Sequence, residues 1–428
     1  MQLNRKLAMA VGSLLAVTQA QAEEWEVDSA VMLYNETDSM GQDRVSIFEP
    51  VVSITQKNTP DDYVKLDFVY DSLTGATPNG ANASSQLQQF PKNNPGYYVK
   101  EGYAPLNTNF EDTRIALNLS TMKPIDRMSR FTAGASYSVE TDYESVGGNF
   151  SYLKDFNNKQ TTVTVGGAYT MDWVNPSVGF KDPFSTLGSS TANTTTSASG
   201  GGEKELSTFN FAGKEKNTLD MILGVSHVLN SKTLLNLNYG ISSTSGYMTD
   251  DYKIISVIDG TTGFAQDYVA EARPDSRFKQ TLKGTVVTAF GADSLHVDYR
   301  YFWDDWDVTA HTFDVKYYLT VGEKLTVRPH FRYSAQTQAN FYRLSLTQGE
   351  ALPKYASADY RLADMTTLTL GAMATYKLAH DLSLSFSMEN ITQSGDSSPA
   401  EAIGDQRTQD MFPTIDMWTY TFGLKSKF

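Results

Sequence analysis

Ionisable side chains stand at alternate positions in several stretches of the second half of the chain. Successive side chains of a β-strand point to opposite faces, so residues of one parity share a face. Between residues 277 and 336 that face is mostly basic and carries Arg277, Lys279, Lys283, His296, Asp298, Arg300, Asp314, Lys316, Arg328, His330 and Arg332. This composition predicts a wet wall that attracts small charged solutes, because rings of fixed charge set ion selectivity in pores.

The same alternation near the start of the chain gives a face of opposite charge. It is mostly acidic, with Glu26, Asp28, Glu49, Asp67, Asp71 and Glu140 against only Lys65 and Arg114. Charged groups at membrane depth are tolerated only in a wet or mutually paired interior. We therefore expect a polar lumen. Either it is open with a field between the two walls, or it is plugged where the walls meet and pair.

Apolar side chains occupy the other parity of these stretches. About sixteen stretches, mostly of ten to fourteen residues, alternate in this way, a length that suits tilted membrane-spanning strands. They are 25–34, 45–57, 62–73, 112–122, 130–140, 144–155, 160–172, 217–229, 232–244, 277–290, 293–304, 307–320, 324–336, 363–377, 381–393 and 415–428. Single-chain bacterial barrels have an even number of strands, which this number satisfies.

The connections between these stretches alternate in length. Every second one is short, and the others are mostly long: 35–44, 74–111, 173–216, 245–276, 337–362 and 394–414, with 141–143 and 305–306 as short exceptions. A Greek-key sandwich has no reason to alternate in this way, whereas outer-membrane barrels have short periplasmic turns and long external loops. The sequence predicts an all-β, transmembrane, up-and-down antiparallel β-barrel. Whether its lumen is open depends on where loops 74–111 and 173–216 lie.

Both ends of the chain carry signals for export. Residues 1–22 have a basic start, an apolar run and an Ala20-Gln21-Ala22 cleavage site, so we expect a cleaved signal peptide and a single barrel domain over 23–428. The last strand has an apolar face made of Trp418, Tyr420, Phe422, Leu424 and Phe428. This ending resembles the C-terminal signature that the assembly machinery of the bacterial outer membrane reads. The expected location is the outer membrane of a Gram-negative bacterium.

Composition narrows the expected partners. The net charge of −14 argues against nucleic acid, since a phosphate-binding surface needs a basic patch. The chain has no cysteine, so it has neither disulfides nor thiolate metal sites, and we predict no cofactor and no bound metal. Expected partners are outer-membrane lipid and lipopolysaccharide, the assembly machinery and small polar solutes. A homo-oligomer or a periplasmic partner remains open.

Two functions fit these features. A sixteen-strand barrel is wide enough for an aqueous channel, which favours porin-like passage of small polar or charged solutes. A plugged lumen would instead make a structural or ligand-binding surface barrel without channel activity. An enzyme is the least favoured alternative. Of the five histidines only His311 lies near the outer rim, and its side chain belongs to the face of the strand that is expected to contact lipid.

Short motifs run along nearly the whole mature chain. They are Asp71–Pro78, Ser138–Ser145, Asp251–Lys253, Arg273–Arg277, Tyr299–Trp306, Arg332-Tyr333, Phe341-Tyr342 and Ser357–Leu362. They resemble a family of proteobacterial outer-membrane barrels catalogued as domain of unknown function 3570, in which Asp251 is usually a proline. The resemblance implies an exported barrel and brings no known substrate or catalytic residue. Because the motifs fall at external strand ends, we expect Arg114, Arg273 and Arg361 to hold the external loops together.

Overall fold

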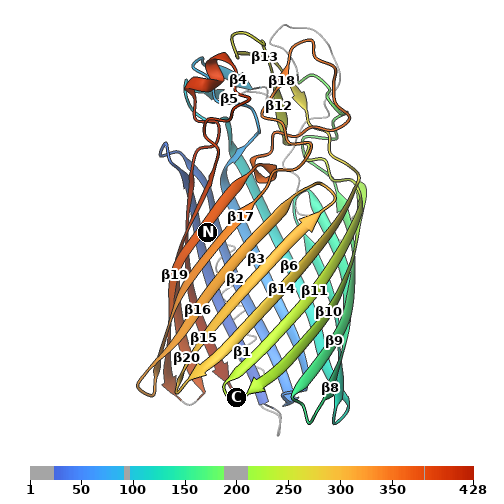
Figure 1. Cartoon of the computed structure of the whole chain (residues 1–428), viewed down its shortest axis with the longest axis vertical. Helices are drawn as coiled ribbons and strands as arrows, with labels where there is room; N and C mark the ends of the chain where they lie inside the picture. Colours follow the sequence, from blue (N-terminus) through green and yellow to red (C-terminus); the bar gives the residue numbers. More distant parts are fainter. Residues whose placement is uncertain (1–23, 91–96, 188–210, 380) are drawn as a thin grey trace, which may run out of the picture.

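Sixteen antiparallel strands form a closed barrel in the computed structural model, which describes residues 24–90, 97–187, 211–379 and 381–428 (Figure 1). The barrel strands are β1 (Glu24–Asp38), β2 (Asp43–Thr59), β3 (Asp62–Pro78), β6 (Leu106–Asp126), β7 (Ser129–Val139), β8 (Tyr143–Phe156), β9 (Thr161–Val174), β10 (Lys214–Asn230), β11 (Thr233–Gly246), β14 (Ser276–Phe290), β15 (Asp293–Asp304), β16 (Thr309–Val321), β17 (Leu325–Gln336), β19 (Met365–Ala379), β20 (Leu382–Gly395) and β21 (Ile415–Lys427). The predicted fold class is confirmed. The predicted signal peptide, 1–22, lies outside the described residues.

The barrel closes where the last strand pairs with the first. β21 pairs with β1 along nearly its whole length, and each of the other barrel strands pairs with its two neighbours in the chain order of the barrel. At the edge of this seam the Phe428 amide donates to the Trp25 carbonyl at 2.8 Å. Closure leaves no unpaired strand edge, so the barrel satisfies its own backbone hydrogen bonds in lipid.

The two faces of the wall differ as the alternation predicts. On the outer face, large apolar side chains such as Tyr299, Phe313, Phe331 and Leu370 are exposed. Their neighbours of the other parity are polar and point into the lumen. Lipid covers such an apolar band, and its burial replaces the packed core that a water-soluble barrel of this size would need.

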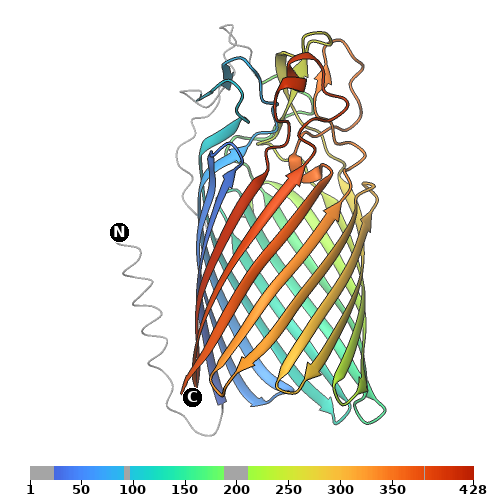
Figure 2. The ribbon, with the colours of Figure 1, turned by 60° about the vertical axis from the view of Figure 1, so that its left-hand side comes forward.

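The connections at the two ends of the barrel differ in size (Figures 1 and 2). The lower end in Figure 1 carries short turns, and the long loops gather above the other end. Several strands, such as β3 and β6, are longer than predicted at the loop end, because their pairing continues to Pro78 and Leu106. The predicted long loop 35–44 is therefore wrong. β1 and β2 extend to Asp38 and from Asp43, which leaves the turn 39–42.

The long loops build a folded layer, which we call the cap: residues 79–90, 97–105, 175–187, 247–275, 337–364 and 396–414. It contains the hairpin β4 (Gln88–Phe90) and β5 (Tyr97–Val99), and a sheet of β12 (Ile254–Ile258), β13 (Ala265–Ala270) and β18 (Leu346–Thr347). Two short 3-10 helices, η1 (Tyr360–Leu362) and η2 (Gly404–Thr408), complete it. No helix in the described ranges is long and apolar enough to cross a membrane.

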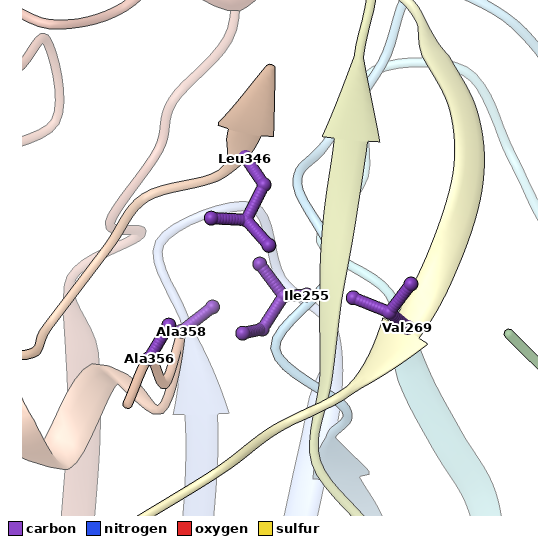
Figure 3. Packing of buried hydrophobic residues seen from close by; sticks show 5 residues of the cluster. All are labelled: Ile255, Val269, Leu346, Ala356 and Ala358. Atoms are coloured by element: carbon purple, nitrogen blue, oxygen red, sulfur yellow. The ribbon is translucent and has the colours of Figure 1, made fainter. Parts of the chain in front are cut away.

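Hydrophobic side chains from different loops pack together in the cap. Ile255 on β12 is fully buried and packs against Val269 of β13, Leu346 of β18, and Ala356 and Ala358 (Figure 3). A second cluster joins Trp306 to Phe341 and Leu362, and a third joins Phe90 to Val99 and Ile254. A buried apolar side chain contributes roughly 1.5–3 kcal/mol, so the cap is a packed structure and not a set of independent loops.

Polar side chains also join the cap loops. The Gln406 amide of η2 donates to Asn82 Oδ1 at 2.9 Å and to Ser345 Oγ at 3.0 Å. Asn82 in turn donates through its side chain to the Leu344 carbonyl at 2.9 Å and through its backbone to Ser256 Oγ at 3.1 Å. One buried hub therefore connects four of the loops.

Candidate functional site

The registers of β14 to β17 bring the charged residues of the predicted basic wall together. Lys283 lies opposite Arg300 on the next strand, Asp314 lies opposite Arg332, and Lys316 lies opposite His330. Residues opposite one another in a sheet share a face, and here that face is the lumen side. The structure places all the predicted wall residues on this parity: Lys65, Asp67, Arg114, Arg277, Lys279, Lys283, Asp298, Arg300, Asp314, Lys316, Arg328, His330 and Arg332.

Several of these cations are neutralised by a carboxylate on the same wall. Lys283 Nζ lies 2.9 Å from Asp298, and Lys316 Nζ lies 3.2 Å from Asp314. His330 is held between two carboxylates, Asp314 at 3.0 Å and Glu389 at 2.9 Å. These groups form a paired part of the wall whose net charge is small.

At the loop end of the barrel the paired residues come from two of the family-like motifs. Arg277 Nε donates to Asp304 at 2.7 Å, and its guanidinium lies 4.2 Å from the ring centre of Trp306. The Asp304 side chain also accepts from the backbone amides of Trp306 and Val308. The carboxylate therefore fixes the turn between β15 and β16.

Four other cations, Lys279, Arg300, Arg328 and Arg332, have no ion-pair partner in the part of the chain that the structure describes, and of these Arg328 lies over the ring of Tyr318. Arg300 makes one long contact, from Nη2 to Thr312 Oγ1 at 3.5 Å, and its buried Nε has no hydrogen-bond partner. A guanidinium with an unused donor in a wet lumen is a ready partner for an anion. Lys279, Arg300 and Arg332 are the candidate site.

The acidic residues lie across the barrel from this basic wall. In the ring of sixteen strands, β14 to β17 are the tenth to thirteenth, and β2, β3, β6 and β7 are the second to fifth, which is half a turn away. Glu49 stands on β2, and Asp67 and Asp71 stand on β3. Lys65 pairs with Asp67 at 2.7 Å, and Arg114 pairs with Asp71. The two walls therefore stand on opposite sides of the barrel.

A cavity of about 580 Å³ lies against the lumen wall between β7 and β15. Lys279 and Arg300 both line it, together with Asp220. Its apolar lining comes from Phe302 and Ile222, which lie on the lumen parity of β15 and β10. Neither apolar residue was predicted as part of the wall, because an aromatic or aliphatic residue on a polar face looks like an exception to the alternation.

The sequence prediction also missed two carboxylates of the lumen. Asp220 lines the cavity, and Glu389 binds His330. The signal for both was present, since each stands on the polar parity of a predicted strand, 217–229 or 381–393. The predicted acidic wall covered only the first strands, so these two residues were left out.

A network of charged residues joins two loops of the cap, 247–275 and 337–364. The Arg273 guanidinium bridges Glu271 at 2.6 Å and Asp359 at 2.8 Å, and Arg361 binds Asp359 and also Asp250 at 2.9 Å. Glu271 and Asp359 are each 1% exposed. All these residues lie in or beside the motifs Asp251–Lys253, Arg273–Arg277 and Ser357–Leu362, which the fold brings to one place.

Burial and neighbouring charge act in opposite directions on these carboxyls. Burial raises the pKa of Glu271 above its ordinary value, against the pull of Arg273. Burial alone would also raise the pKa of Asp359, but Lys253 and Arg361 outweigh it and hold that pKa well below its usual range. Asp359 is therefore a permanent anion that ties three cations of two loops together.

Lys253 connects this network to the end of a barrel strand. It is 2% exposed, its ammonium donates to the carbonyl of Pro78 at the end of β3, and burial lowers its pKa. Asp251 precedes the Tyr252-Lys253 pair. Its carboxylate accepts from the Lys181 amide at 2.8 Å and the Tyr247 hydroxyl at 2.7 Å, which fastens the loop 175–187 to the loop 247–275. No group of three or more His, Asp or Glu side chains suited to a metal ion occurs within the described ranges.

Comparison with known proteins gives a family and a set of similar folds. The family model described as "Protein of unknown function (DUF3570)" matches residues 5–426, and no curated protein matches the chain. Solved structures that resemble it include the toluene transporter TodX of P. putida, at 11% identity over 96% of this chain and 91% of that chain with a TM-score of 0.40. The outer membrane protein opdK of Pseudomonas aeruginosa has 9% identity over 94% of this chain and 99% of that chain, with a TM-score of 0.39. At these scores the similarity is too loose to carry a solute or a mechanism.

Proposed function

Because the chain belongs to the DUF3570 family of proteins of unknown function, whose model spans nearly its whole length, the fold comes with no assigned solute, and we propose one from the lumen. The protein lies in the outer membrane of a Gram-negative bacterium. It lets small polar or charged solutes pass through a charge-lined lumen, and it favours anions. The apolar outer face contacts lipid and lipopolysaccharide, and the C-terminal strand is the segment that the assembly machinery binds.

The observation that carries this proposal is the set of unpaired cations on the lumen wall. Lys279, Arg300 and Arg332 stand on one side of the lumen without carboxylate partners among the described residues. Burying a charge without a partner costs several kcal/mol, so such a cluster is stable only where water or a passing anion solvates it. A fully plugged and dry lumen does not suit these three side chains.

A second candidate is a capped barrel that binds a ligand without conducting. The packed cap favours it, because hydrophobic clusters and the Asn82–Gln406 hub join the loops above the lumen. A catalytic role has less support. His330 is engaged by two carboxylates, and outward-facing His311 is hydrogen-bonded to Tyr299 at 2.7 Å.

Single-channel conductance in a planar bilayer separates the two candidates. We expect stable current steps from the refolded protein and, in a salt gradient, a reversal potential of anion-selective sign. Arg300→Ala and Arg332→Ala each remove an unpaired lumen cation, so each shifts the reversal potential towards cation selectivity. Arg343→Ala removes an exposed cation of the cap and leaves the potential unchanged. A silent bilayer, with folding shown by heat-modifiable gel mobility, contradicts the channel and favours the capped barrel.

A further inference from the structure

The cavity on the lumen wall has a cation at each of two levels and an apolar band between them. Residues paired across neighbouring strands form rows along the wall. One row holds Lys279 and Asp304, another holds Lys283 and Arg300, and the row between them holds Thr281 and Phe302. All the rows share one face of the sheet, so side chains of successive rows lie above one another along the barrel axis. Lys279 and Arg300 therefore border the same space from two levels.

Small residues make room for a ligand on the neighbouring strands. The row of Thr281 continues through Gly240 on β11 to Ile222 on β10, and Gly166 and Ala168 line the cavity from β9. A wall without side-chain bulk at these positions is recessed, and the recess has the volume of about 580 Å³ given above.

The polar groups of the recess have unused hydrogen-bonding capacity. Arg300 Nε and Ser242 Oγ are buried and have no hydrogen-bond partner, and neither Lys279 nor Arg300 has an ion pair in the described part of the chain. Arg332 stands without an ion pair on the same wall, so the local charge stays positive although Asp220 also lines the recess. The recess therefore attracts a negative group and not a cation.

The apolar lining narrows the class of anion. Phe302 and Ile222 offer hydrophobic contact that an inorganic anion cannot use, while the planar guanidinium of Arg300 matches a carboxylate in a two-point contact. Ligand sites combine such a mostly apolar surface with a few convergent polar groups. Both features are present here.

We propose that this recess binds a small organic carboxylate during its passage. Arg300 holds the carboxylate, Lys279 supplies a second cation, and Phe302 and Ile222 contact the hydrocarbon body. This assignment deepens the proposed channel function by naming a solute class, and it rests on that function.

Calorimetry on the full-length folded protein in detergent tests the site without requiring conduction. The probe is cyclohexanecarboxylate, compared with the uncharged cyclohexanecarboxamide and with inorganic phosphate. We expect saturable binding of the carboxylate, and binding of the amide and the phosphate at least about tenfold weaker, because each lacks one of the two features that the recess recognises. Phosphate bound as tightly as the carboxylate overturns the assignment in favour of an unselective anion site.

Variants locate the binding in the recess. Arg300→Gln should weaken carboxylate binding by about 10–100-fold, the usual effect of losing a hydrogen bond to a charged group. Arg300→Lys, which keeps the charge but loses the planar fork, should have a smaller effect and guards against misfolding of the first variant. Lys65→Gln removes a lumen cation on the opposite wall that is already paired with Asp67, and should leave the affinity unchanged. Equal losses in Lys65→Gln and Arg300→Gln contradict the site.

The two proposals fail in different ways. A folded barrel that conducts but binds no carboxylate refutes the recess as a solute site and keeps the channel. A folded barrel that binds the carboxylate through Arg300 but passes no current refutes the channel and leaves a ligand-binding barrel.

Discussion

Asp359 shows how single residues hold the cap of this barrel. It is almost fully buried, and it receives hydrogen bonds from Arg273 and Arg361 and from the backbone amide of Arg361. Removing one partner of a buried ion pair leaves a desolvated charge behind, which costs about 3–5 kcal/mol. The cost is smaller where the partner is partly exposed, because water then solvates the charge that is left.

We therefore expect Arg273→Ala to open the cap more than Arg361→Ala. The Arg273 side chain is 11% exposed and serves both Glu271 and Asp359, while the Arg361 side chain is 53% exposed. Limited proteolysis and hydrogen exchange of residues 247–275 and 337–364 measure the opening, with Arg343→Ala as an exposed control. Equal protease resistance of all the variants contradicts a role of the network in holding the loops.

Glu140 makes the stability of the turn between β7 and β8 depend on pH. It is half-buried in the turn between β7 and β8, where burial first and then the charge of Asp112 raise its pKa from 4.5 to about 7. A carboxyl whose pKa rises on folding favours the folded state at low pH, and this contribution is lost as the pH rises from the unfolded pKa to the folded one. The turn is therefore most stable below about pH 4.5 and weaker at neutral pH.

Glu140→Gln should remove this dependence. We expect the variant turn to be about 1–3 kcal/mol more stable than the wild type at neutral pH and little changed below about pH 4.5. Hydrogen exchange of residues 140–142, corrected for the intrinsic rate at each pH, provides the measurement, and exposed Glu350→Gln is the control. A parallel pH profile in the wild type and the variant contradicts this role of Glu140.

At the scale of elements, the barrel strands follow from the sequence and the cap strands do not. Alternating runs such as 293–304 mark β15 to the residue, because one face must meet lipid and the other water. β12, by contrast, is buried on both sides by other loops and reads Ile254–Ile258 without strong alternation. Its partners, β13 and β18, are set by tertiary contacts between loops, and a single sequence contains no local signal for such pairing.

The core of the cap should be as sensitive to cavities as that of a soluble domain. Ile255→Ala removes a fully buried side chain between Val269 and Leu346 and should destabilise the cap by about 2–5 kcal/mol. The barrel has its own hydrogen bonds and should keep its heat-modifiable gel mobility, while trypsin cleaves the loops faster. Exposed Leu352→Ala is the matched control. Loss of the barrel together with the cap contradicts their independence.

The terminal strand has a role that is separate from the cap. Deleting Phe428 removes its amide hydrogen bond to the Trp25 carbonyl and the last aromatic side chain of the outer face. We expect a several-fold drop in folded protein in the membrane of cells, with a smaller effect on refolding in detergent. Ser426→Ala is the control, and equal amounts of the two variants in the membrane contradict an assembly role for this residue.

For the whole molecule, strand alternation sorts the charged residues onto one face of the wall. The registers place the wall residues, from Lys65 to Arg332, on the same face of neighbouring strands, and their role in the lumen stays a prediction. That the acidic and basic walls lie opposite one another depends on the number of strands, which sets which elements are half a turn apart. The recess beside Phe302 was beyond prediction, since it arises from Gly240 and Gly166 on strands that the charge pattern did not mark.

The contacts of the cap also bear on the order in which the cap and the barrel form. Its hub joins Asn82, Ser256, Ser345 and Gln406, which lie on four loops far apart in the chain. In an open chain each of these contacts would require closing a loop of many residues, at a large entropic cost. Once β21 has docked on β1, the bases of all the loops are fixed around one rim and that cost has already been met. We therefore expect the cap to form last, so that a protease-resistant loop 247–275 would report that insertion of the barrel is complete.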